Sequence, residues 1–116
     1  MESNYWPIIR KAYAGFNTRD IDSVFSVMSP EINWPKAFEG GYVTGYEAVR
    51  AYWTKQWSEI NPKVEPVAIT ERPDGKVEVL VDQLVKDLEG NILFQGQVKH
   101  IYTFFNHLIF TMNIEL

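Results

Sequence analysis

Residues 77–105 read VEVLVDQLVKDLEGNILFQGQVKHIYTFF, and this stretch decides the fold class. Apolar and polar residues alternate on both sides of Glu89-Gly90, which is typical of two antiparallel strands joined by a tight turn. With Glu89 and Gly90 as the two loop residues, Leu88 lies opposite Asn91, and the pairing continues backwards in the same register. We therefore expect a β-hairpin whose two faces differ in character.

The inner face of this hairpin is nearly all apolar and must be covered by helices. Its polar exceptions are Gln83, His100 and the hydroxyl of Tyr102. Burying a polar group without a partner costs about 1–3 kcal/mol, so these positions are where we expect chemistry or ligand recognition. The residues predicted to face inward are Val77, Val79, Val81, Gln83, Val85, Phe94, Val98, His100, Tyr102 and Phe104.

The outer face mixes apolar and charged residues. It is more polar than a core but too apolar to lie fully in water, which suits a contact between subunits. The sequence therefore predicts a homodimer through this face. Asp82, beside Gln97 and Lys99, is expected to make a cross-strand or dimer contact. The apolar residues predicted on this face are Leu80, Leu84, Leu93 and Ile101.

Further strands flank the hairpin. Period-two patterns predict strands over 64–72, 76–88, 91–105 and 108–116. Pro73-Asp74-Gly75 and Asn106-His107 supply the remaining turns, and His107 should be exposed.

The first 35 residues read as two helices and a short strand. Helical spacing from Ile9 to Phe16 predicts a helix that Asn17 can close. The residues that mark the second helix, which starts at Asp20 and is ended by Ser29-Pro30, are Ile21, Val24, Phe25 and Met28. Residues 31–34 then alternate as a strand does, until Pro35 stops it.

A third helix follows a glycine-rich loop over 39–43. Thr44 and Glu47 have the spacing of a capping box, so the helix should begin near Gly45. Asn61-Pro62 should end it. Its apolar side is formed by Tyr46, Val49, Trp53, Trp57 and Ile60.

Composition limits the function. The chain has 116 residues, 46% hydrophobic, with 7 Phe, 6 Tyr and 4 Trp, which predicts one folded domain over 1–116. A net charge of −4 makes nucleic acid a poor partner. Without cysteine and with only two histidines, a metal site is not expected, and no glycine motif for phosphates indicates an organic cofactor. No long apolar run or signal peptide is present, so we expect a cytoplasmic protein without membrane contact.

The order of elements resembles a known fold. Residues 12–34 (AYAGFNTRDIDSVFSVMSPEINW), 45–57 (GYEAVRAYWTKQW) and 98–114 (VKHIYTFFNHLIFTMNI) are similar to the SnoaL-like and ketosteroid isomerase-like proteins of the nuclear transport factor 2-like superfamily. The resemblance implies an α+β cone, in which three N-terminal helices pack on a curved, mostly antiparallel sheet. Fold does not fix function, because this fold hosts isomerases, cyclases, dehydratases, hydrolases and binding modules.

The resemblance also implies positions for a site. His100 falls where ketosteroid isomerase has its oxyanion-hole aspartic acid, so it is the candidate catalytic residue, as acid, base or carbonyl polariser. Trp34 falls where the catalytic base would be, and tryptophan cannot abstract a proton. Tyr13 lies one step beyond the position of the catalytic tyrosine. The residues expected to frame the pocket are Gln83, Tyr13, Trp34, Trp53, Trp57 and Tyr102.

Each of these residues has a structural alternative. His100 is equally well a core histidine, and Gln83 either orients it, binds ligand, or is only its structural partner. Trp53 and Trp57 are most simply core residues, whereas Trp34 at the mouth of the cone could floor a pocket for a flat apolar ligand.

Two functions therefore remain open from the sequence. The first is a cofactor-independent enzyme that isomerises, cyclises or dehydrates a small hydrophobic carbonyl compound, polyketide- or steroid-like, by proton transfer at His100. The alternative is a non-catalytic module that binds a hydrophobic ligand or dimerises.

Overall fold

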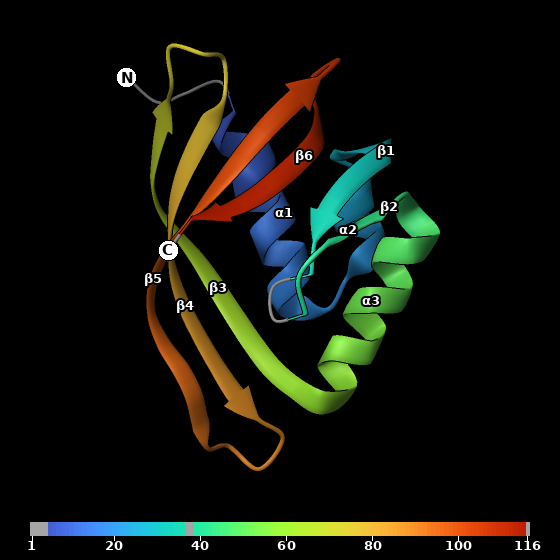
Figure 1. The fold of residues 1–116 in the computed structure, drawn as a ribbon, viewed down its shortest axis with the longest axis vertical. Helices are drawn as coiled ribbons and strands as arrows, with labels where there is room; N and C mark the ends of the chain where they lie inside the picture. The colour runs from blue at the N-terminus through green and yellow to red at the C-terminus, as the bar shows by residue number, and fades with distance from the viewer. Residues whose placement is uncertain (1–4, 37–38, 116) are drawn as a thin grey trace.

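The computed structural model describes residues 5–36 and 39–115 (Figure 1). Its helices are α1 (Trp6–Thr18), α2 (Ile21–Phe25) and α3 (Tyr46–Glu59). Its strands are β1 (Met28–Pro35), β2 (Tyr42–Thr44), β3 (Ile60–Glu71), β4 (Val77–Asp87), β5 (Ile92–Phe105) and β6 (Leu108–Glu115).

The described strands form one mixed sheet in the order β2-β1-β6-β5-β4-β3. β1 runs parallel to β6, and every other neighbouring pair is antiparallel. The sheet curves, with α1 and α3 on its concave side (Figure 1). This agrees with the predicted α+β architecture and with a mostly antiparallel sheet.

The first two helices form as predicted, but each of them ends at a different residue from the predicted one. Asp20 caps α2, because its carboxylate accepts a hydrogen bond from the backbone N–H of Ser23. α1 continues past Asn17 and closes at Arg19, which adopts a left-handed conformation with φ of 63°. The prediction that Met28 belongs to the second helix and that Ser29-Pro30 ends it was wrong. α2 stops at Phe25, and Met28 already pairs with Ile109 in the sheet.

The third helix begins near Gly45 as predicted, but its cap and its end differ from the prediction. Gly45 caps it with φ of 88°, without any side-chain cap. The Thr44 hydroxyl instead bonds Asn33 across β1 and β2, because residues 42–44 form a strand rather than a loop. α3 ends at Glu59, and β3 begins at the next residue, Ile60. Asn61-Pro62 therefore lies inside the strand and does not end the helix.

The β4–β5 hairpin has the predicted register from its middle onward. Val85 is opposite Phe94, Gln83 is opposite Gly96, and Val79 is opposite His100. The turn is wider than predicted, because the Asp87 carboxylate accepts from the backbone N–H groups of Glu89 and Asn91.

Leu88 and Asn91 consequently do not pair. Lys86 is opposite Ile92, and Leu93 is the extra residue of a β-bulge that restores the register at Phe94. The predicted turn was therefore wrong, whereas the predicted pairing from Val85 and Phe94 onward is confirmed. The bulge changes the direction of the Leu93 side chain.

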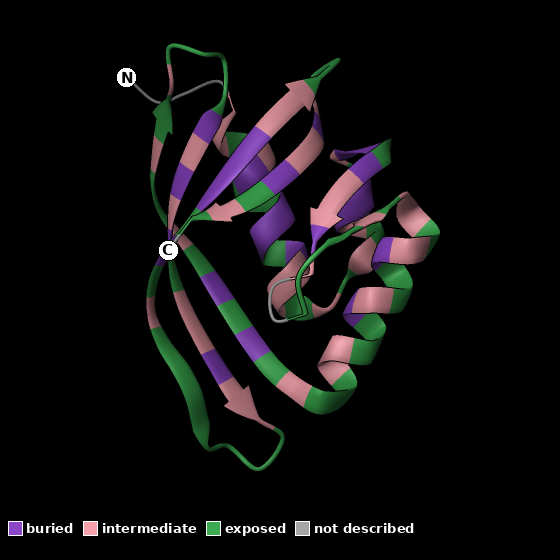
Figure 2. Ribbon diagram, viewed as in Figure 1, coloured by how far each residue is buried: buried purple, intermediate pink, exposed green. Residues whose placement is uncertain are grey.

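The inner face carries the core. Val77, Val79, Val81 and Val85 are almost completely buried, as the alternation predicts. Burial decreases toward the β4–β5 turn, where the end of β5 is exposed (Figure 2). Phe94 is the predicted inner residue that is least covered, at 36% exposure.

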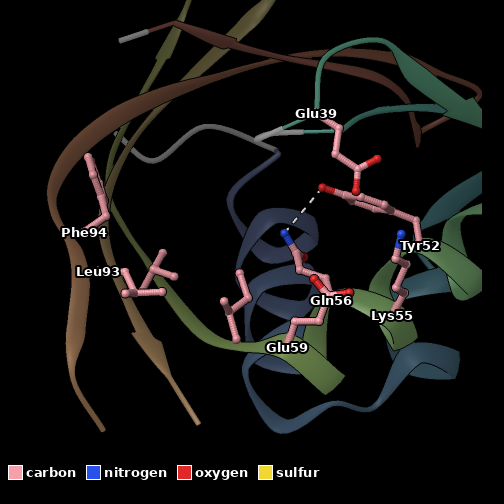
Figure 3. Close-up of a pocket in the computed structure, with 9 residues that line it drawn as sticks. Glu39, Tyr52, Lys55, Gln56, Glu59, Leu93 and Phe94 are labelled. Carbon is pink, nitrogen blue, oxygen red and sulfur yellow. Dashed lines mark hydrogen bonds between the residues drawn. The ribbon is translucent and has the colours of Figure 1, made fainter. Parts of the chain in front are cut away.

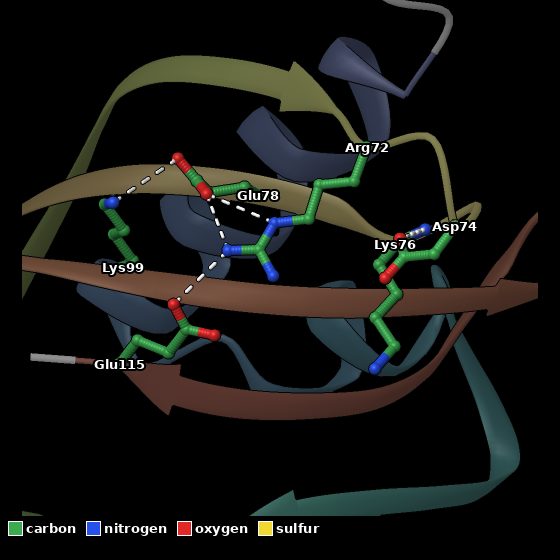
Figure 4. Close-up of polar contacts among 6 residues, drawn as sticks. All are labelled: Arg72, Asp74, Lys76, Glu78, Lys99 and Glu115. Atoms are coloured by element: carbon green, nitrogen blue, oxygen red, sulfur yellow. Dashed lines mark hydrogen bonds and ion pairs between the residues drawn. The ribbon is translucent and has the colours of Figure 1, made fainter.

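The outer face is held by an ion-pair cluster (Figure 4). Arg72 bonds Glu78 of β4 at 2.7 Å and Glu115 of β6 at 3.3 Å, so its side chain crosses β5. Ile101 of β5, opposite Glu78, is only 4% exposed within the single chain. The predicted cross-strand contact of Asp82 is confirmed, since Gln97 donates to its carboxylate at 2.9 Å.

β3 is an edge strand with unusual pairing on its open side. The Asn17 side chain of α1 donates to the carbonyl of Val64 at 2.6 Å and accepts from its N–H at 2.9 Å. Pro62 and Pro66 carry no N–H, which an edge strand tolerates. The clamp at Val64 fixes α1, and with it Tyr13 one turn earlier, against the sheet.

Candidate functional site

A chain of three polar side chains lies inside the cone. Tyr102 donates to the hydroxyl of Tyr13 at 2.7 Å, and that hydroxyl lies 2.7 Å from Nδ1 of His100. His100 and Tyr102 face the same way because they are two residues apart on β5. Tyr13 reaches them from α1, so the open question of its direction is answered: it points inward and is buried.

Burial sets the protonation state of this chain. It lowers the pKa of His100 to about 4, so the imidazole is neutral near pH 7. Burial also raises the pKa of Tyr13 well above its ordinary value, and the neighbouring Tyr102 adds to that rise. The pKa of Tyr102 is raised by burial too. Both phenols therefore keep their protons and act as donors.

The direction of the hydrogen bonds selects one form of the imidazole. Tyr13 accepts from Tyr102, so its own proton is directed to Nδ1 of His100. A neutral imidazole whose Nδ1 accepts carries its proton on Nε2. No other described residue hydrogen-bonds to the imidazole of His100, which leaves Nε2–H available to a ligand.

Two small chambers adjoin His100. The inner chamber has a volume of about 40 Å³ and is lined by Tyr13, Tyr102, Trp34, Trp53 and His100 among others. The middle chamber, of about 50 Å³, shares His100 and Trp34 with it and adds Tyr52, Gln56 and Gln83. Each has room for one or two water molecules, since a water occupies about 30 Å³ in the liquid.

A larger pocket opens next to the middle chamber (Figure 3). This mouth pocket measures about 400 Å³ and shares Tyr52 and Gln56 with the middle chamber. Leu93 and Phe94 of β5 line one side and face α3 across the pocket (Figure 3). The mouth pocket and the middle chamber thus share lining residues, as do the middle and the inner chambers.

The tryptophans fill the cone more than the sequence predicts. Trp53 is 0% exposed and meets Trp34 edge to face, with ring centroids 5.1 Å apart. Phe16 packs against Trp53 from α1. These rings occupy the space in which a flat ligand was expected. Of the tryptophans expected to frame the pocket, Trp34 and Trp53 border the inner chamber.

Two predicted site residues are placed differently. Gln83 lines the middle chamber beside His100 but makes no hydrogen bond to it, so the orienting partner is Tyr13 instead. Trp57 lines neither chamber of the described part of the chain. It packs on Phe16 and Trp53, beneath the guanidinium of Arg19.

Sequence reasoning missed most of the lining of the middle chamber, including three residues with large side chains on α1 and α3. Phe16 follows Tyr13 by three positions, and Tyr52 and Gln56 are four apart on α3, where Gln56 donates to the Tyr52 hydroxyl at 3.4 Å. Their i,i+3 and i,i+4 spacing was the available signal. His107, in the β5–β6 turn, is exposed as predicted.

No group of three or more histidine, aspartate or glutamate side chains within 5–36 and 39–115 is arranged to hold a metal ion. In the same residues, no helix has both the length and the hydropathy needed to cross a bilayer.

This arrangement, a curved sheet with helices on its concave side, is the nuclear transport factor 2-like fold. An NTF2-like protein of unknown function from Burkholderia pseudomallei matches with a TM-score of 0.84 at 22% identity, covering 99% of this chain and 92% of that one. TerC co-crystallised with polyporic acid matches at 0.83 and 24% identity, covering 97% and 90%. A Mycobacterium tuberculosis protein in complex with estradiol-17β-hemisuccinate matches at 0.80 and 13% identity, covering 97% and 93%.

Other matched structures include proteins assigned as polyketide cyclases and one with a ketosteroid isomerase-like fold. No protein-family model matches the sequence, and no curated protein sequence matches it significantly. The likeness confirms the fold that the sequence predicted.

Proposed function

We propose that this protein binds a small, mostly apolar carbonyl compound whose oxygen accepts a hydrogen bond from Nε2–H of His100. The observation that carries the proposal is the Tyr102–Tyr13–His100 chain, because it directs the only proton of the neutral imidazole away from Tyr13. The remaining walls of the inner chamber are apolar or aromatic. Such a site favours a ligand with one well-placed acceptor.

Binding without turnover is the primary candidate. No carboxylate lines the inner or middle chamber in the part of the chain that the structure describes. Trp34 borders both chambers and offers no base. The groups that remain are donors, which polarise a carbonyl but do not abstract a proton.

Catalysis is the second candidate, and one feature favours it. A neutral imidazole N–H held in a buried site can stabilise an oxyanion as it forms, in isomerisation, cyclisation or dehydration. His100 would then be the catalytic residue in the sense of a polariser, with water or the substrate supplying the base. Several structural neighbours are assigned as polyketide cyclases, which supports testing such substrates.

The test compares a ketone with its hydrocarbon analogue. Isothermal titration calorimetry should show that 4-(2-naphthyl)butan-2-one binds about fivefold to tenfold more tightly than 2-butylnaphthalene, since a buried hydrogen bond contributes about 1–1.5 kcal/mol. The variant His100→Phe should abolish this preference. The infrared carbonyl stretch of the bound ketone should lie at lower frequency in the unmodified protein than in the variant. Equal binding of both compounds by the unmodified protein contradicts the proposal.

A homodimer through the outer sheet face is the assembly we propose. Support comes from Leu80 and Leu84, which are half-buried in the single chain. Ile101 is already covered within the chain, and Leu93 lines the mouth pocket, so the apolar part of the face is smaller than predicted. Sedimentation equilibrium tests it: a dimer that Leu84→Asp dissociates supports this face, and a monomer of 13.5 kDa contradicts it.

A further inference from the structure

Of these three neighbouring spaces, the mouth pocket is the one large enough for a ring system. A cavity of about 150 Å³ holds one benzene molecule. The inner and middle chambers, at about 40 and 50 Å³, are far below that volume. The mouth pocket, at about 400 Å³, lies within the range of small-molecule sites, about 300–1,000 Å³.

The walls of the mouth pocket are apolar where they meet the sheet. Leu93 and Phe94 form this side, whereas Gln56 and charged residues of α3 form the other (Figure 3). Val85 of β4 and Ile60 at the start of β3 also line the pocket. Apolar side chains on one wall and polar ones at the rim suit a flat apolar body with its edge toward solvent.

The β-bulge in β5 builds this wall. In a regular hairpin Leu93 would point to the outer face while Phe94 pointed inward. The bulge brings both side chains to the same pocket. Leu93 stays 58% exposed and Phe94 36% exposed, so the bulge presents uncovered apolar surface at the entrance. Bulges commonly re-aim a side chain next to a functional site.

We propose that the ring system of the ligand is bound in the mouth pocket, between α3 and the bulged end of β5, while only a narrow carbonyl-bearing end passes Tyr52 and Gln56 to reach His100. The inference rests on the proposed function for the carbonyl end. It specifies the ligand class: a flat apolar compound of about two rings, with its carbonyl on a short chain. A bulky ring carbonyl would not pass the middle chamber.

A matched pair of variants tests the position of the ring. Leu93→Asp places a carboxylate in the pocket wall, and Ile92→Asp places one on the neighbouring residue, which is equally exposed at 58% but does not line the pocket. Both side chains are too exposed for their replacement to unfold the chain. Leu93→Asp should weaken binding of 4-(2-naphthyl)butan-2-one at least about tenfold, because the carboxylate must be desolvated against the ring. Ile92→Asp should change it less than about twofold.

A second measurement needs no variant. On titration with the ketone, methyl resonances of Ile60 and Leu93 should shift in NMR spectra of the unmodified protein, and those of Ile92 should not. Equal effects of the two variants, unmoved Ile60 and Leu93 methyl groups, or no binding of the ketone each overturn the inference. If the ketone and 2-butylnaphthalene bind equally and Leu93→Asp weakens both, the mouth pocket is upheld and only the carbonyl contact at His100 fails.

Discussion

The hydroxyl of Tyr13 lies 2.7 Å from Nδ1 of His100, although 87 residues separate them in the chain. The contact joins α1 to β5 across the core and determines which imidazole nitrogen carries the proton. The chemistry of His100 therefore depends on how α1 is docked as well as on its own strand.

Replacing Tyr13 by Phe should remove the hydrogen bond that determines which imidazole nitrogen of His100 carries the proton. Without the donor at Nδ1 the imidazole can adopt either neutral form, so ketone affinity should fall several-fold and stability by about 1–2 kcal/mol. Nitrogen-15 NMR of His100 should show a mixture of the two forms in place of Nε2–H alone. Tyr46→Phe is the control, since Tyr46 lines neither chamber and its hydroxyl bonds the carbonyls of Phe25 and Met28. It should lower stability without changing the His100 signal, and an unchanged signal in Tyr13→Phe would refute the assignment.

The depressed pKa of His100 predicts a pH dependence of stability. Burial disfavours the imidazolium, so the unfolded chain, with a pKa of 6.5, takes up this proton before the folded chain, with a pKa of about 4. The stabilisation is complete above pH 6.5, is lost as the pH falls toward 4, and changes no further below that. The loss amounts to about 3 kcal/mol.

Urea unfolding from about pH 7.5 to about pH 4 measures this loss. His100→Phe should lose less stability than the unmodified chain over that interval, by about the same 3 kcal/mol, because the titrating group is gone. His107→Gln, at an exposed turn, should follow the unmodified chain. Parallel curves for all three proteins would show that His100 does not titrate as described.

The Asn17 clamp on β3 should be a main support of the site. Asn17→Ala removes two hydrogen bonds and leaves the N–H and carbonyl of Val64, a residue 6% exposed, without those partners. We expect a loss of about 2–3 kcal/mol and faster hydrogen exchange of the Val64 amide. The matched variant Thr18→Ala removes one hydroxyl, which is shared between the carbonyls of Ala14 and Gly15 within the same helix, and should cost less than about 1 kcal/mol. Equal losses in the two variants would argue against a special role for Asn17.

Gly45 should resist substitution although space surrounds it. Its φ of 88° and ψ of 161° fall in a region that is essentially restricted to glycine, so Gly45→Ala should cost about 1–3 kcal/mol. The nearest atom to an added Cβ would be the carbonyl oxygen of Pro30 at 3.8 Å, so the cost is conformational and not steric. Gly96→Ala, where φ is not positive, should lower the melting temperature much less. A similar decrease in both would contradict this explanation.

Alternation of residue type was enough to predict most of the sheet and its buried face. The pairing of Val79 with His100 follows from it, because a shift by one residue would expose the valines of β4. The bulge at Leu93 did not follow, since it depends on how the Asp87 carboxylate closes the turn. Pairing between strands likewise placed Met28 opposite Ile109 in the sheet, and it turned the Thr44 hydroxyl toward Asn33 instead of the helix.

The candidate site was predictable in part. Inward placement of His100 and Tyr102 came from the register, and the resemblance brought Tyr13 near them. Tyr13, and not Gln83, is the hydrogen-bond partner of His100 because of how α1 is docked on the sheet. The spacing of apolar residues along the sequence does not predict that docking. The filling of the cone by Trp34, Trp53 and Phe16 is a property of three-dimensional packing, so the size of the chambers could not be predicted.

The open edge of β3 affects whether another polypeptide chain can pair with the sheet. An open strand edge is a template on which a second chain can add by backbone pairing, the route to domain swapping and fibrils. Here Pro62 and Pro66 lack donors, a bulge follows at Val67, and the Asn17 side chain occupies the groups of Val64 between them. Strand addition along β3 is therefore blocked at successive positions, which protects a sheet rich in valine from aggregating through this edge.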